Sequence, residues 1–288
     1  MIPGAFEYHR PASLAEAVAL LGRLDSDARL IAGGHSLIPM MKLRLAAPSH
    51  LVDLAGVAEL KGVRADGGDI VIGPMTTQHD IIASGLIAEH VPILRETAEV
   101  IADPQVRYVG TIGGNVANGD PGNDMPALMI TLGATYVLSG PGGERRVPAR
   151  DYYLGLYETA ARPGEVLAAI RVPKPPAGHG FAYEKLKRKV GDYATAAAAV
   201  ILTVANGRVA TCAIGLTNVA PTALLANDAA AAVIGSALDK ATLARASAAA
   251  TAAASPAADG RGSAEYRARM AGVMTARALA RAFARARS

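Results

Sequence analysis

The chain has no Trp, three Phe and a single Cys among its 288 residues. One cysteine excludes an internal disulfide framework and a metal cluster bound by the chain's own thiolates. Aromatic residues for stacking on bases are scarce and the net charge is only +4, so the composition does not support nucleic-acid binding. Half of the residues are apolar, and Ala, Leu, Val and Ile must therefore fill the core.

Long apolar runs and a leader-like N-terminus are also missing. The longest apolar run, 194–205, is far shorter than the roughly 20 residues of a membrane-spanning helix. Pro3, Glu7 and Arg10 stand where a signal peptide would need apolar residues. We expect a cytoplasmic protein without a transmembrane segment. A peripheral position at the inner face of the cytoplasmic membrane is the weaker alternative, based on the basic C-terminal stretch.

No spacing of side chains suggests a metal site or a nucleophile. The histidines, at 9, 35, 50, 79, 90 and 179, show neither H-x-x-H nor H-E-x-x-H spacing, and no Cys joins them. No Ser/His/Asp order or Cys/His pair favours a hydrolase. Cys212 lies in an apolar, strand-like run, where a lone Cys is most often an inert small hydrophobe. The sequence predicts no metal ligand and no catalytic side chain.

Residues 1–57 have the pattern of a small α/β unit. Ser13 and Glu16 are spaced as a capping box at the start of a helix. Strands are expected at 29–32 and 51–54, with a short helical or irregular stretch between them.

Residues 58–176 change to hairpins and short helices. Apolar runs around glycine-rich turns predict hairpins over 60–73 and 135–147. The other elements expected there are helices at 77–83, 92–101 and 125–132 and a strand at 165–172.

A Pro- and Gly-containing linker, 174–180, leads into the third unit, residues 177–288. Asn206-Gly207 between two apolar runs predicts a hairpin over 195–216. The remainder is Ala-rich and helical in propensity. Its last helix is expected over 265–288. One face of this helix should be apolar and carry Tyr266, Met270, Val273 and Met274, while most of its arginines lie on the other faces.

Two Gly-Gly segments are the most informative feature: AGGHS at 32–36 and TIGGN at 111–115. Glycine pairs let backbone N–H groups come within hydrogen-bond reach of a ligand, and they allow a positive φ. One pair alone is more often a structural turn, but two pairs with polar neighbours indicate a dinucleotide bound from both sides. The chain has neither G-x-G-x-x-G nor G-x-x-x-x-G-K-[ST], so these are not Rossmann or P-loop sites.

Polar residues beside the glycines extend this interpretation. The Ser36 hydroxyl and the exposed N–H groups suit a diphosphate, while Thr111, Asn115 and Asn118 supply further donors. Asp124 has two interpretations: it is the N-cap of the 125–132 helix, with Asp120 as the competing cap, or it accepts the hydroxyl protons of a ribityl or ribose chain.

A basic run, KLKRK at 185–189, precedes Gly191-Asp192-Tyr193. A solvated strand end explains most of these side chains. The alternative places one lysine near a phosphate or cofactor edge, and Tyr193 against an aromatic ring.

These motifs resemble the FAD-binding subunits of molybdenum hydroxylases. AGGHSLIPMMK at 32–42, TIGGN at 111–115 and the following Asp120-Pro121 and Asp124 carry the likeness, which runs over the whole chain. YEKLKRK at 183–189, GDYA at 191–194 and DGRG at 259–262 are similar to the medium, flavoprotein subunits of aerobic carbon monoxide dehydrogenases. The resemblance implies an α+β, vanillyl-alcohol-oxidase-like FAD-binding fold, with two N-terminal α/β subdomains and a C-terminal antiparallel sheet with helices.

For the site, the resemblance implies that two segments, 30–37 and 111–115, wrap the FAD diphosphate. Asp124 would contact the polyol and Tyr193 would lie against the isoalloxazine ring. The run of lysines permits a shift of two residues, so Lys187 is an alternative to Lys185. The cofactor-binding residues expected from sequence are Leu30, Ile31, Ala32, Gly33, Gly34, His35, Ser36, Leu37, Ile101, Ala102, Thr111, Gly113, Gly114, Asn115, Asn118, Asp124, Leu167, Lys185 and Tyr193.

The resemblance also implies partners. A large molybdenum-containing subunit and a small iron–sulfur subunit would join this chain in a dimer of heterotrimers, and electrons would pass through FAD to a quinone or another respiratory acceptor. The single cysteine agrees, because the electron source must lie on another chain. Two alternatives are an FAD subunit for an aldehyde, purine or N-heterocycle hydroxylase, and a binding module without electron transfer.

Overall fold

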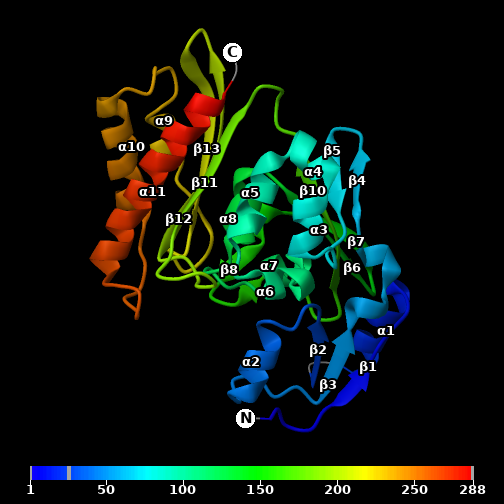
Figure 1. The fold of residues 1–288 in the computed structure, drawn as a ribbon. Coiled ribbons are helices and arrows are strands. Elements are labelled where there is room, and N and C mark those ends of the chain that lie inside the picture. The colour runs from blue at the N-terminus through cyan, green and yellow to red at the C-terminus, as the bar shows by residue number, and fades with distance from the viewer. Residues whose placement is uncertain (1, 25–26, 287–288) are drawn as a thin grey trace.

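The computed structural model describes residues 2–24 and 27–286, which form three successive units around three main sheets (Figure 1). The first sheet has the order β1-β3-β2, the second β4-β5-β10-β6-β7 and the third β11-β12-β13-β14. The expected mixed helix and sheet architecture, ending in an antiparallel sheet with helices, is confirmed.

The first unit is a small parallel sheet with one covering helix. Its elements are β1 (Glu7–His9), α1 (Leu14–Leu24), β2 (Ala28–Ile31), α2 (Leu37–Lys42) and β3 (His50–Asp53). Strand β1 was not predicted from sequence, because its three residues are too few for an alternating pattern to be recognised. At the start of α1 the Glu16 N–H donates to Ser13 Oγ at 3.2 Å, but the Glu16 carboxylate accepts from Ala12 N–H, so the capping box is incomplete.

The second unit has an entirely antiparallel sheet with six helices along it. Its strands are β4 (Val63–Asp66), β5 (Asp69–Ile72), β6 (Thr135–Gly140), β7 (Gly143–Pro148) and β10 (Val166–Pro173), with a small hairpin of β8 (Tyr153–Gly155) and β9 (Glu158–Thr159). Its helices are α3 (Gln78–Ala83), α4 (Gly85–His90), α5 (Pro92–Val100), α6 (Pro104–Val109), α7 (Ile112–Ala117) and α8 (Asp124–Thr131).

Three of these helices, α4, α6 and α7, were not predicted from sequence. Each has six residues, as the predicted α3 does, and over so short a length the helical period alone does not identify a helix. Their N-caps were nevertheless readable, because the side chains of Ser84, Asp103 and Thr111 each accept the N–H three residues later.

The third unit is a sheet with helices on one face. It contains β11 (Gly180–Leu186), β12 (Ala196–Ala205), β13 (Arg208–Thr217), β14 (Leu224–Leu225), α9 (Asn227–Ala231), α10 (Lys240–Ala253) and α11 (Ala264–Arg285). The predicted hairpin is confirmed: Asn206 and Gly207 have φ of 52° and 70°, as a type I′ turn requires. The burial of Cys212 raises the pKa of its thiol to about 12, so it is a poor nucleophile.

Strand β12 is apolar along nearly its whole length because both of its faces are buried. Ala198 and Val200 pack in the core beneath α10 and α11, whereas Ala197 and Ala199 pack in the core of the second unit. This alternation follows the two-residue period of a strand. Figure 1 shows α10 and α11 on one side of this sheet and α8 on the other.

The C-terminal helix differs from its predicted pattern. Tyr266 is 43% exposed, whereas Arg267 is 4% exposed. The Arg267 guanidinium donates to the carbonyl oxygens of Thr195, Ala257 and Asn218, which makes its burial tolerable. Small residues such as Ala271 and Ala278 form much of the buried face. Of the predicted apolar residues, Met274 is buried there and Met270 and Val273 are partly buried against the same core. Residues 287 and 288 of the predicted helix lie outside the described residues.

No helix among the described residues is both long and apolar enough to cross a membrane.

We predict that Gly272→Ala lowers the free energy of unfolding by about 1–3 kcal/mol, because of overpacking where α11 crosses α10. A Cβ at Gly272 would lie 2.5 Å from the Ser247 carbonyl oxygen and 2.3 Å from Thr251 Oγ1. Chemical denaturation followed by circular dichroism measures the change.

The control is Gly22→Ala, in the exposed part of α1, where a Cβ meets no atom within 4 Å. It should stabilise the chain by roughly 0.5–1 kcal/mol through helix propensity. If Gly272→Ala were stabilising as well, close packing of α10 on α11 would not be the constraint.

Candidate functional site

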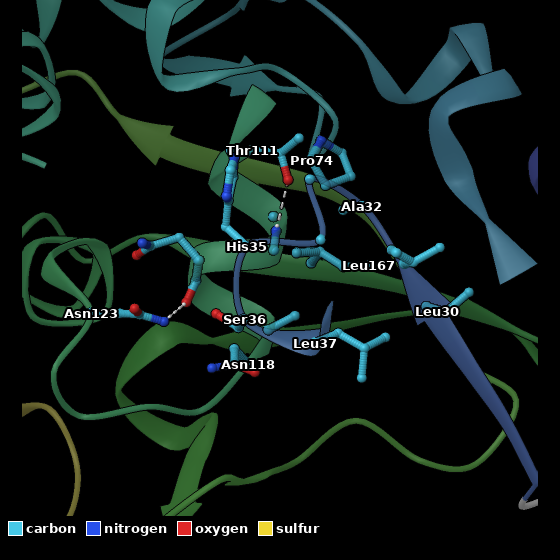
Figure 2. Close-up of a pocket in the computed structure, with 18 of the residues that line it drawn as sticks. Leu30, Ala32, His35, Ser36, Leu37, Pro74, Thr111, Asn118, Asn123 and Leu167 are labelled. Carbon is cyan, nitrogen blue, oxygen red and sulfur yellow. Dashed lines mark hydrogen bonds between the residues drawn. The ribbon is translucent and has the colours of Figure 1, made fainter. Parts of the chain in front are cut away.

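One cavity of about 1060 Å³ runs past the first unit, the helices of the second unit and the end of β11. This volume lies at the upper end of the roughly 300–1,000 Å³ range of small-molecule sites. Every one of the nineteen residues expected from sequence lines it. Figure 2 shows the loop after β2, with His35 and Ser36, beside Thr111 and Asn118 from the second unit.

The first Gly-Gly segment is shaped by a close backbone contact. A Cβ at Gly33 would lie 2.5 Å from the Val109 carbonyl oxygen, and Gly34 has a φ of 72°. Within the described residues, the backbone N–H groups of 33–36 donate no hydrogen bond to another part of the chain. This loop therefore presents donors that suit an anionic group.

The second Gly-Gly segment has a different role from the one expected. It is the first turn of α7, and its N–H groups are already engaged: Gly113 donates to the Pro74 carbonyl at 2.8 Å and Gly114 donates to Thr111 Oγ1 at 3.0 Å. A Cβ at Gly113 would lie 2.4 Å from the Pro74 Cβ. These glycines allow α7 to approach its neighbours closely, and they do not offer free N–H groups to a ligand.

Unpartnered amides on the cavity wall point to a polar ligand. Asn118 Nδ2 is buried without a hydrogen-bond partner, and so are both amide atoms of Gln78, which is 2% exposed. Burying such groups unpaired is costly, so a ligand in the cavity is a natural partner for them. Gln78 was not among the residues expected from sequence, because nothing in its local pattern distinguishes a buried Gln in the first turn of a helix.

Asp124 is not the N-cap that one interpretation proposed. It is the first residue of α8 and is 4% exposed, while the N-cap position is Asn123. The Met125 N–H is taken by Asn115 Oδ1 at 3.2 Å, so Asp124 has no cap to make. The competing cap, Asp120, accepts the Gly122 N–H in the preceding turn.

The Asp124 carboxylate is instead bound from β11. Tyr183 donates its hydroxyl to Oδ1 at 2.6 Å, and Lys185 Nζ donates to Oδ2 at 2.7 Å. Burial, together with the Asp124 charge, raises the pKa of Tyr183 well above its usual value, which keeps the hydroxyl protonated as a donor. A carboxylate has about four acceptor positions, so Asp124 retains capacity for a ligand hydroxyl.

The structure separates the two candidate lysines. Lys185 lies on the cavity wall with 3% of its side chain exposed, whereas Lys187 does not line the cavity. Lys187 Nζ donates to the Val100 carbonyl at 3.2 Å. Burial and the neighbouring Lys185 charge lower the pKa of Lys187. Residues two apart on a strand share a face, but Lys187 lies beyond the end of β11. Lys185 lies within the strand and on the cavity wall, which favours it over Lys187 as the contact residue.

Tyr193 and three aliphatic residues form the less polar part of the wall. Tyr193 is 40% exposed, and the Arg261 guanidinium lies 5.7 Å from its ring centroid. Ile101, Ala102 and Leu167 line the same cavity. A half-exposed aromatic ring beside aliphatic side chains can stack on a flat ring system. The cavity thus combines free N–H groups, amides, a carboxylate and an aromatic face, which fits a large ligand carrying an anionic group, hydroxyls and a ring.

Comparisons with known proteins agree with this chemistry. Residues 4–175 match the FAD binding domain in molybdopterin dehydrogenase, and residues 181–282 match the CO dehydrogenase flavoprotein C-terminal domain. The chain is 64% identical over 288 residues to the carbon monoxide dehydrogenase medium chain of Afipia carboxidovorans, with 100% of each chain covered. It is 52% identical over 285 residues to the medium chain from Hydrogenophaga pseudoflava, with 99% of each covered.

Solved structures give the same result. A chain of the Cu,Mo-CO dehydrogenase in its cyanide-inactivated form matches with a TM-score of 0.98 at 64% identity, covering 99% of this chain and 100% of that one. Quinoline 2-oxidoreductase from Pseudomonas putida 86 matches with a TM-score of 0.94 at 37% identity, covering 99% of each chain.

The fold, the cavity and these matches define a flavoprotein subunit of a molybdopterin-type oxidoreductase, with FAD as its cofactor. Within this class, the chain belongs to the family of carbon monoxide dehydrogenase medium chains.

We predict that Lys185→Met lowers the free energy of unfolding by about 3–5 kcal/mol, because it removes one partner of a buried ion pair and leaves Asp124 without it. Lys187→Met is the matched control. The Lys187 amine contacts the same Val100 carbonyl but forms no ion pair with a carboxylate among the described residues, so this variant should cost less than about 1 kcal/mol. Urea unfolding measures both. Equal losses in the two variants would contradict the importance of the Asp124 ion pair.

We predict opposite effects of Gln78→Leu on stability and on cofactor binding. Without FAD the variant should be more stable than wild type by up to about 1–3 kcal/mol, because two unpaired buried atoms disappear. The affinity for FAD should fall by about 10-fold or more, because the cofactor loses a hydrogen-bonding partner. FAD titration of flavin-depleted complex and thermal unfolding measure the two effects.

Thr97→Val is the control for this prediction. Thr97 Oγ1 is also buried and unpartnered, but Thr97 does not line the cavity. This variant should keep the wild-type FAD affinity. An unchanged FAD affinity in Gln78→Leu would show that Gln78 does not contact the cofactor.

Proposed function

We propose that this chain transfers electrons within a carbon monoxide dehydrogenase: electrons from iron–sulfur clusters on a partner chain reach a quinone or another respiratory acceptor through its FAD. The observation that carries the proposal is that all nineteen expected residues line one cavity. The chain also matches a carbon monoxide dehydrogenase medium chain over the full length of both. FAD supplies the redox chemistry when bound.

The chain's own residues bind and orient the cofactor in this proposal. The free N–H groups of 33–36 are placed for the diphosphate, and Gln78, Asn118 and Asp124 for the polyol hydroxyls. Tyr193 offers its ring to the isoalloxazine. The N–H groups at the start of α7 already donate hydrogen bonds within the chain. FAD would therefore be contacted in this turn through side chains or van der Waals packing, by Thr111, Gly113, Gly114 and Asn115. No residue acts as a proton-transfer catalyst.

The proposed partners are those implied by the family to which the chain belongs, and its cysteine content agrees with them. Its one cysteine cannot ligate an iron–sulfur cluster, and burial raises the pKa of that thiol. The electron source therefore lies on another subunit. We propose a large molybdenum-containing subunit and a small iron–sulfur subunit, assembled as a dimer of heterotrimers in the cytoplasm, with contact to the inner membrane face as the weaker alternative.

We further propose three units with boundaries near those expected, 1–57, 58–176 and 177–288. Each contains one of the three main sheets, which supports the division. The cores are not fully separate, since Tyr183 and Ala194 of the third unit pack into the core of the second.

A second function within the same class is an FAD subunit for a different substrate. One such alternative is the FAD subunit of an N-heterocycle hydroxylase. The TM-score of 0.94 to quinoline 2-oxidoreductase supports it, because enzymes that act on different substrates share this fold. An aldehyde or purine hydroxylase subunit stands in the same position. A binding module without electron transfer is the remaining alternative.

The test is the visible absorption spectrum of the chain purified with its partner subunits. We expect one FAD per chain, and rapid bleaching of the flavin absorption on anaerobic addition of carbon monoxide. Bleaching by an aldehyde, a purine or an N-heterocycle instead of carbon monoxide would identify the second function. A flavin that stays oxidised with all of them would favour the binding module, and a colourless complex would overturn the proposal.

A further inference from the structure

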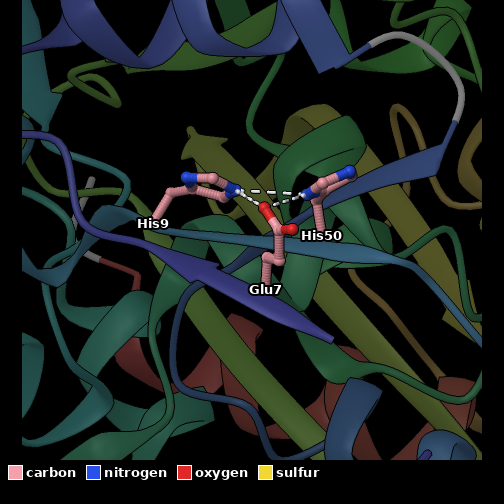
Figure 3. A group of neighbouring side chains, drawn as sticks. All are labelled: Glu7, His9 and His50. Atoms are coloured by element: carbon pink, nitrogen blue, oxygen red, sulfur yellow. Dashed lines mark hydrogen bonds and ion pairs between the residues drawn. The ribbon is translucent and has the colours of Figure 1, made fainter. Parts of the chain in front are cut away.

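Three polar side chains converge on the first sheet, outside the FAD cavity (Figure 3). Glu7 and His9 lie two residues apart on β1 and therefore project from the same face of that strand. His50 is the first residue of β3 and pairs directly with Glu7 in the parallel register. The pairing of β1 with β3 thus brings together two imidazoles and one carboxylate that are far apart in sequence.

The ligand atoms of this group face one another at short range. His9 Nε2 lies 3.2 Å from His50 Nδ1, and the Glu7 carboxylate oxygen Oε2 lies 3.5 Å from His50 Nδ1 and 3.9 Å from His9 Nε2. Among the described residues this is the one group of three His, Cys, Asp or Glu side chains whose ligand atoms all lie within 4.8 Å of one another.

These spacings are close to those of a tetrahedral metal site. Zn²⁺ bonds to His nitrogen and carboxylate oxygen at about 2.0–2.2 Å, so its ligand atoms in a tetrahedral site lie about 3.3–3.6 Å apart. Two of the three measured distances are within a few tenths of an ångström of this range. The third, 3.9 Å, involves Glu7, whose side chain is 74% exposed and free to rotate toward the histidines.

The chemistry of the donors selects the kind of ion. Two imidazole nitrogens favour zinc and similar transition metals over Mg²⁺ and Ca²⁺, which take oxygen ligands. Two His and one carboxylate leave a fourth tetrahedral position for water. The histidine side chains are 24% and 22% exposed, so an ion can reach them from solvent.

We propose that Glu7, His9 and His50 bind one Zn²⁺ ion, which links β1 to β3. The site is separate from the FAD cavity, since none of the three residues lines it. Spacing along the sequence gave no sign of it, because His9 and His50 stand 41 residues apart and meet only through strand pairing. Strand β3 lies between β1 and β2, and β2 leads into the Gly33-Gly34 loop. The ion would therefore hold the edge strand β1 against β3, in the sheet that supports this loop.

The test is a Zn²⁺ titration of the chelator-treated full chain in its complex, with Co²⁺ as a spectroscopic probe. Wild type should bind one equivalent of Zn²⁺. The variants Glu7→Gln, His9→Gln and His50→Gln should each bind Zn²⁺ more than about 100-fold more weakly, because losing a direct ligand costs more affinity than losing a residue that only hydrogen-bonds to a ligand. Co²⁺ should give the intense visible bands of tetrahedral coordination. Hydrogen exchange of the β1 amides should slow when Zn²⁺ is added.

His90→Gln is the matched control, because His90 also faces a carboxylate, Glu89, at 3.8 Å but lacks a third ligand. It should bind Zn²⁺ like wild type. Glu7 is exposed, so Glu7→Gln keeps the test valid if a histidine variant folds poorly. Absence of saturable binding near one equivalent, or equal binding by wild type and Glu7→Gln, would overturn the proposal.

Discussion

A buried carboxylate links the second and third units at the wall of the cavity. Asp124 begins α8 in the second unit, and both of its oxygens accept hydrogen bonds from β11 in the third, from Tyr183 and Lys185. A buried charge is tolerable only when it is paired and hydrogen-bonded. This constraint fixes α8 against β11 and so fixes one side of the cavity. The shape of the cavity therefore depends on that junction between the second and third units.

The third unit meets the same junction from its other elements. A Cβ at Gly215 of β13 would lie 2.1 Å from Thr131 Oγ1 and 2.5 Å from the Ala127 carbonyl oxygen, so α8 lies directly on the sheet. The alanines of β12 that face the second unit leave room for this approach. The absence of Trp and the scarcity of Phe are consistent with such packing, in which small side chains let backbones come close.

The sequence predicted the elements whose signals are local. Asn206-Gly207 fixed a hairpin turn, and the helices with a clear apolar period were found within a few residues of their observed bounds. The two Gly-Gly segments located the cavity, although their structural roles differ. Gly33-Gly34 lies in a loop with free N–H groups, whereas Gly113-Gly114 allows α7 to pack closely against its neighbours. Both produce the same Gly-Gly pattern, because a ligand and a neighbouring backbone exclude a Cβ equally.

Composition, local pattern and resemblance thus determined the class of fold, the cofactor and the residues that line the cavity. The tertiary structure decided three things that no local pattern contains. It assigned the Asp124 carboxylate to Tyr183 and Lys185 instead of a helix N-terminus, it placed Gln78 on the cavity wall, and it brought His9 to His50. Each is a contact between segments distant in the chain. Such contacts depend on how strands and helices pair and pack, whereas turns and caps depend on neighbouring residues alone.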